Sequence, residues 1–171
     1  MKRSKIAKSL GLAVILQLCV LVGMVVKAAM PLWTGQEIRV KTIPIDPRSM
    51  FRGNYARLNY EIGQLPGRAL SEYASLRKGE VVYISLQTGD DGLFHYADAS
   101  LTKPEAGVFL RGRTTNSVPP YRVKYGIEAY FAPKEKALKL ERELRESGVA
   151  VLMVSDSGQV ALQNVIAGSG E

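Results

Sequence analysis

The residues QEIRVKTI (36–43) alternate between apolar and polar side chains, with the apolar ones at every second position from Ile38. The residues YARLNYEI (55–62) repeat this alternation, with their less polar side chains at every second position from Ala56. A period of two is the repeat of a β-strand, whose side chains point alternately to its two faces. Both stretches therefore predict half-buried strands of a β-rich domain.

Turn residues and apolar runs predict the rest of that domain. A turn at Gly89–Gly92 predicts a hairpin of residues 80–87 and 93–97. Further strands are predicted at 108–113, 122–131, 149–154 and 159–166, the last two forming a final hairpin around Asp156–Gly158. A short helix is predicted at 70–76 and one clear helix at about 134–147, opened by Pro133 and capped by Gly148. The expected fold class is α+β, with a β-rich, mainly antiparallel domain.

Residues 1–27 contain five of the 23 basic residues and none of the 16 acidic residues. These charges flank the apolar run LGLAVILQLCVLVGMVV (10–26), which is long enough to cross a bilayer once a few flanking residues are added. More positive charge before the run than after it predicts an N-terminus in the cytoplasm. We therefore expect a single transmembrane helix in the cytoplasmic (inner) membrane and a periplasmic, or extracytoplasmic, C-terminal domain.

The expected organisation is a basic cytoplasmic tail (1–8), a transmembrane anchor (9–27), a membrane-exit segment (28–34) and an extracytoplasmic domain (35–171). Pro31 is expected to end the helix, and Trp33 to lie in the interfacial aromatic belt. A cleaved signal peptide is the alternative, since it also has a basic start and an apolar middle. The length of the run and Lys27 at the cleavage position favour the uncleaved anchor.

The formal net charge of +7 does not predict a nucleic-acid-binding protein. Outside residues 1–27 the chain has 18 basic and 16 acidic residues, so the domain is close to neutral. One Cys and one His exclude a disulfide framework and argue against a Cys- or His-based metal site. We expect no cofactor, no metal and no nucleic-acid partner.

The segment GNYARLNY (53–60) resembles the signature of the GDYXXLXY family of membrane-anchored bacterial proteins. The match continues in FLRGR (109–113) and YGIEAYF (125–131), in the same order along the chain. The resemblance implies a membrane-anchored protein with no established activity, which associates with a multi-pass integral membrane protein. It supplies no catalytic residues. Asn54 stands where the family has Asp. If that position only shapes the turn, Asn54 keeps its role, whereas a function that depends on the charge of the Asp would be lost.

Charged and aromatic side chains crowd the loop and strand around this motif. They form a candidate recognition surface, in which Arg would bind a carboxylate or phosphate and Tyr would act as an amphipathic anchor. The alternative is a structural corner closed by their own ion pairs. The candidate residues are Asp46, Arg48, Arg52, Asn54, Tyr55, Arg57 and Tyr60, with Tyr125, Glu128 and Tyr130 as a second, weaker set.

The favoured function is that of a membrane-anchored binding or accessory protein. Its helix would pack on a partner with the help of Gly11, Gln17 and Gly23. A Ser–Lys peptidase resembling type I signal peptidase is one alternative, with Ser49 as nucleophile and a desolvated Lys124 as base. An envelope glycan-binding domain is another, and it would need its tyrosine rings exposed in one groove. Whether the protein is an enzyme is left open, with a non-enzymatic role favoured.

Overall fold

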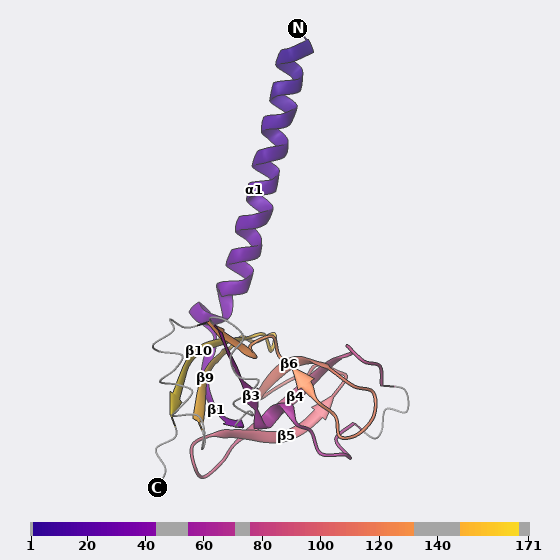
Figure 1. Ribbon diagram of the computed structural model, residues 1–171, viewed down its shortest axis with the longest axis vertical. Coiled ribbons are helices and arrows are strands. Elements are labelled where there is room, and N and C mark those ends of the chain that lie inside the picture. Colours follow the sequence, from indigo (N-terminus) through magenta and orange to yellow (C-terminus); the bar gives the residue numbers. More distant parts are fainter. Residues whose placement is uncertain (1, 44–54, 71–75, 132–147, 168–171) are drawn as a thin grey trace.

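The computed structural model describes residues 2–43, 55–70, 76–131 and 148–167, of which 2–7, 55–57, 130, 131 and 167 are described by their backbone alone. A long helix, α1 (Lys2–Thr34), projects from a β-rich domain that holds the other elements (Figure 1). The predicted helix at 134–147 and residues 71–75 of the predicted short helix lie outside the described residues. The described fold is one apolar N-terminal helix followed by antiparallel sheets, as expected for the α+β class.

In the part of the chain that the structure describes, three antiparallel sheets make up the domain. The first has the strand order β10-β9-β1-β3, from β1 (Gln36–Ile43), β3 (Asn59–Tyr60), β9 (Gly148–Val154) and β10 (Val160–Ala167). The second has the order β5-β4-β6-β7, from β4 (Val81–Thr88), β5 (Phe94–Ser100), β6 (Val108–Thr114) and β7 (Val123–Lys124). The third pairs β2 (Tyr55–Arg57) with β8 (Ala129–Phe131).

One hydrophobic core lies between the two larger sheets. Alternate residues of β1 are buried, among them Ile38 and Val40, and β4 repeats this pattern with Val82 and Ile84. Leu152 of β9 belongs to the same buried cluster. The period-two patterns therefore predicted the buried faces correctly, and each strand buries its apolar side against the other sheet.

The turn between β9 and β10 joins the two sheets. Its residue Gly158 accepts a hydrogen bond of 2.8 Å from the backbone N–H of Arg111 in β6. Gly158 has a φ of +76°, and a Cβ on it would lie 2.7 Å from a ring carbon of Phe109. Only glycine combines this conformation with such a close approach.

Helix α1 continues through Pro31, so the predicted end of the helix at this residue is wrong. A proline removes one N–H from the helix and its ring crowds the carbonyl four residues earlier, but its own carbonyl can still accept a hydrogen bond. The Pro31 carbonyl accepts the N–H of Gly35 at 2.9 Å, and the helix ends at Thr34. A Cβ on Gly35 would lie 2.9 Å from the backbone N of Val154, so the helix end packs directly on β9.

Two long predicted strands are interrupted. Residues 55–62 form β2, β3 and the start of the 3₁₀ turn η1 (Glu61–Gly63), although Leu58, Tyr60 and Ile62 still share the buried side. Residues 122–131 form β7 and β8, separated by a turn in which Gly126 has a φ of +87°. A residue with positive φ cannot continue a strand, and the chain therefore passes from one sheet to another at this point.

Candidate functional site

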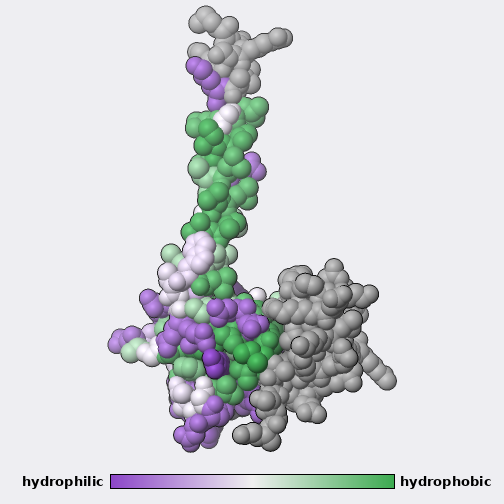
Figure 2. Space-filling view, turned by 90° about the vertical axis from the view of Figure 1, so that its left-hand side faces the viewer, coloured by the Kyte–Doolittle hydropathy of each residue, from purple (hydrophilic) through white to green (hydrophobic). Residues whose placement is uncertain are grey.

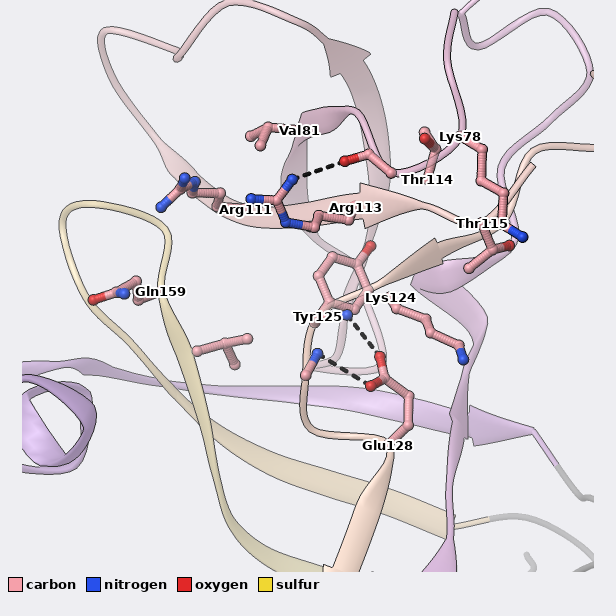
Figure 3. A pocket seen from close by; sticks show the side chains of 14 residues that line it. Lys78, Val81, Arg111, Arg113, Thr114, Thr115, Lys124, Tyr125, Glu128 and Gln159 are labelled. Atoms are coloured by element: carbon pink, nitrogen blue, oxygen red, sulfur yellow. Dashed lines mark hydrogen bonds between the residues drawn. The ribbon is translucent and has the colours of Figure 1, made fainter. Parts of the chain in front are cut away.

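A groove of about 760 Å³ opens on the domain beside β6 and β7, and we call it the basic groove (Figure 3). Its walls come from the turn before β4, from β6 and β7, from the turn before β8 and from the start of β10. The lining residues are Lys78, Gly79, Val81, Arg111, Gly112, Arg113, Thr114, Thr115, Lys124, Tyr125, Gly126, Glu128, Gln159 and Val160. Four of these side chains are cationic and one is anionic.

Tyr125 lies within the groove and is held from two sides. Its hydroxyl donates a hydrogen bond of 2.6 Å to the carbonyl of Ile62. A Cβ on Gly112 would lie 3.0 Å from the Tyr125 ring and closer still to Val123, so only glycine lets the ring pack across β6. Burial, with the charge of Glu128 as a smaller cause, raises the pKa of the Tyr125 hydroxyl above its ordinary value. The hydroxyl therefore remains a protonated donor.

Glu128 holds the turn that precedes β8. One carboxylate oxygen accepts the N–H of Tyr125 at 2.6 Å, and the other accepts the N–H of Gly126 at 3.1 Å (Figure 3). Both carboxylate oxygens are therefore occupied by backbone amides of the turn. Among the described contacts, Glu128 forms no ion pair with Arg111 or Arg113. Glu128 binds its own backbone instead.

The cations of the basic groove are little compensated by charge. Arg113 donates from Nη1 to the carbonyl of Gly79 at 2.8 Å, which fixes its guanidinium but leaves its charge. In the described part of the chain the ion pairs are Arg39 with Glu37 and His95 with Asp91, and neither involves a groove residue. Arg113 also lies directly opposite Lys124 in the β6–β7 pair. Like charges at opposed positions destabilise a sheet, so this pair is not explained by folding stability.

The structure brings the motif segments 55–62 and 125–131 together. Tyr55 pairs with Phe131 and Arg57 with Ala129 in the small sheet, and the N–H of Leu58 donates to the carbonyl of Glu128 at 2.8 Å. Strand position alone is described for Tyr55, Arg57 and Tyr130, and Tyr130 lies opposite Ala56. Four other candidates lie outside the described residues: Asp46, Arg48, Arg52 and Asn54.

Tyr60 is a structural residue. Its ring is 3% exposed, and its hydroxyl donates to the carbonyl of Ile127 at 2.7 Å. Burial, with a smaller contribution from the charge of Glu128, raises the pKa of this hydroxyl above its ordinary value. A ring enclosed in this way cannot stack on a sugar, so Tyr60 does not fit the glycan-binding alternative.

Lys124 is exposed on β7. The Ser–Lys mechanism needs a lysine that burial has partly deprotonated, because a hydrated ammonium holds its proton at neutral pH. Lys124 does not have that environment, and Ser49 lies outside the described residues. Among the residues that the structure describes, no three His, Cys, Asp or Glu side chains gather as metal ligands would.

The candidates from the sequence did not include Lys78, Arg111, Arg113 or Gln159, which line the groove. Arg111 and Arg113 could have been found from the sequence, because two arginines separated by one residue of a strand share a face. Lys78 and Gln159 come from turns far apart in the sequence, and only the folded chain brings them to one groove.

Comparison with known proteins gives one family. The family model described as GDYXXLXY protein matches residues 17–165, which is most of the chain. No curated protein and no solved structure matches. The match covers the second half of α1, both motif segments and all but the last two residues of the final hairpin.

Proposed function

The chain belongs to the GDYXXLXY family, and we propose that it is a single-pass, membrane-anchored accessory protein whose extracytoplasmic domain binds an integral membrane protein. The observation that carries this proposal is the exposure of α1. The most apolar 18-residue window within Lys8–Thr34 has a mean hydropathy of 2.5, and the domain buries none of it. Figure 2 shows apolar surface along the length of this helix, outside the domain.

An apolar surface of this extent is unstable in water, because transfer of each exposed Leu or Val side chain into an apolar phase is favourable by about 1.5–3 kcal/mol. Exposed side chains of this kind include Leu10, Leu12, Ile15 and Val20, which point around the helix rather than along one stripe. A helix that is apolar all round suits a lipid environment. The 27 residues extend about 40 Å, more than the hydrocarbon core of a bilayer.

The orientation that we propose places residues 1–8 in the cytoplasm and the domain on the other side of the membrane. The support is the positive-inside rule applied to Lys2, Arg3, Lys5 and Lys8 against Lys27. Trp33 is 69% exposed one residue before the end of α1, where an interfacial indole would lie. Because Gly35 joins α1 to β1 without a linker, the domain would rest close to the membrane surface.

The anchor is tested by membrane fractionation and intact mass. The full chain should stay in the membrane pellet after alkaline carbonate extraction and should retain residues 1–27. A mature chain that begins near Ala29, or release into the carbonate supernatant, would show that the segment is a signal peptide rather than an anchor.

The partner is tested by purification of the full chain from native membranes in a mild detergent. A multi-pass membrane protein should co-purify, and Arg48→Ala combined with Arg52→Ala should reduce its yield while circular dichroism remains unchanged. Lys41→Ala combined with Arg39→Ala is the matched control, since it removes the same charge from β1. A partner-free monomer in the native membrane extract would count decisively against the accessory role.

A further inference from the structure

We propose that the basic groove binds the phosphate groups of anionic lipid headgroups on the membrane surface from which α1 emerges. The proposal rests on the membrane anchor proposed above. It adds a second membrane contact, made by the domain itself and selective for lipid charge.

The position of the groove is the first argument. One of its walls is the start of β10, and α1 contacts both β9 and β10 at the end of the first sheet. Gly35, directly after α1, packs on Val154, and Gly158, four residues later, accepts a hydrogen bond from Arg111. In Figure 1, β6 lies nearer to α1 along the long axis than β4 and β5 do. The wall formed by Arg111 and Gln159 therefore lies beside the point where the chain leaves the helix.

The second argument is the charge of the groove. Arg111, Arg113, Lys78 and Lys124 come from three separate segments, and Figure 3 shows them around the Tyr125–Glu128 turn. No described carboxylate forms an ion pair with any of the four cations. Both oxygens of Glu128, the one acidic group, are already bound to backbone amides.

The opposed pair of Arg113 and Lys124 points to an external anion. A cross-strand pair of like charges costs stability when it has no counter-ion, and a phosphate between the two strands would supply one. The hydrogen bond to the Gly79 carbonyl fixes the Arg113 side chain, so its guanidinium is oriented before an anion binds. Arginine offers phosphate a planar pair of donors, and lysine offers a point charge.

A lipid surface suits this arrangement better than an acidic peptide does. The negative potential of an anionic leaflet falls off within about one Debye length, so it acts on cations that are held close to the surface. The absence of a linker after Thr34 holds the domain there permanently. An acidic peptide would need no such position next to the helix.

The experiment uses the full chain in nanodiscs of zwitterionic phospholipid, with or without an anionic phospholipid. A bimane label is attached at Ser157→Cys in a Cys19→Ser background, because Ser157 is exposed in the turn that contacts β6. Lipids with a nitroxide on the headgroup, present at the same fraction in all discs, quench the label when the turn approaches the surface.

Quenching in the wild-type background should increase when the anionic lipid is added. Arg111→Gln combined with Lys124→Gln should abolish that increase, whereas Arg39→Gln combined with Lys41→Gln, which removes the same charge from β1, should keep it. Raising the salt from about 0.05 M to about 0.5 M should suppress the increase without any mutation, because screening shortens the range of the interaction. The salt measurement tests the proposal even if the double variant fails to fold.

Equal quenching in both lipids would overturn the proposal. So would loss of the increase in the β1 control, which would show that net charge alone is responsible. Poly-glutamate that binds the groove equally in both kinds of disc, with no effect of lipid charge on quenching, would assign the groove to an acidic peptide instead. Co-elution of chain and disc is measured separately, so failure of the anchor is distinguished from failure of the groove.

Discussion

Replacing Tyr60 by Phe tests whether one buried hydroxyl holds the two motif segments together. The substitution keeps the ring, which is 3% exposed, and removes only the O–H group that donates to the Ile127 carbonyl at 2.7 Å. Ile127 is itself 7% exposed, so water has little access to the carbonyl that loses its donor. Leaving a buried acceptor unpaired costs about 1–3 kcal/mol, and we expect a loss of about 2 kcal/mol.

The measurement is the urea midpoint of domain unfolding, read by pulse proteolysis of the full chain in a mild detergent. Tyr83→Phe is the matched control. Its ring lies in β4 with Phe109 at a centroid distance of 6.0 Å, and its hydroxyl has no hydrogen-bond partner among the described residues. The control should change stability by no more than about 0.5 kcal/mol. If both variants lost the same free energy, the Tyr60–Ile127 bond would not be the contact that joins the segments.

Three further predictions concern the same region and the helix junction. The folded pKa of Tyr60 is raised above 10.0, so its contribution to stability is complete below that pH and is lost as the pH rises further. The urea midpoint should therefore fall from about pH 9 to pH 11. Tyr60→Phe should reduce this fall. Gly126→Ala, at a φ of +87°, should lower the free energy of unfolding by about 1–2 kcal/mol in the same assay. Gly67→Ala is the control, because the nearest atom to its added Cβ is 3.8 Å away, and it should cost less than half of that. Gly35→Ala should make the chain between α1 and β1 more sensitive to limited proteolysis, because its Cβ would lie 2.9 Å from the backbone of Val154; unchanged cleavage would contradict the close packing described.

The strands were predictable from the sequence where buried and exposed side chains alternate along them. In β1 and β4 every second side chain enters the core, so the apolar pattern and the strand coincide. The hairpin of β4 and β5 was predictable from the alternation in β4 and from its glycine-bounded turn. The interruption of 122–131 was not, because the apolar and aromatic residues on both sides of Gly126 continue a strand-like pattern through the turn. The positive φ of Gly126 is accommodated by bonds from two backbone amides to Glu128.

The candidate residues were predicted because they lie close together in the sequence. Residues that are close in the sequence need not face a ligand together. This criterion singled out Tyr60, Tyr125 and Glu128, and the structure shows each of them bonded to backbone of the domain. Tyr60 and Tyr125 each bond a distant segment, and the Glu128 side chain holds its own turn, so all three have a structural role. The groove cations escaped the search because antiparallel pairing, not sequence distance, places Lys124 opposite Arg113.

The sequence by itself determined the class of the protein: an apolar helix with basic flanks, a β-rich domain of nearly neutral charge and the motif of one family. These properties follow from composition and local period, which each segment carries independently of the others. Only the tertiary structure decided that α1 continues through Pro31 onto β9, and that cations from three segments line one groove beside that junction. Close packing and strand pairing set these relations, because they depend on which surfaces meet after the chain has folded.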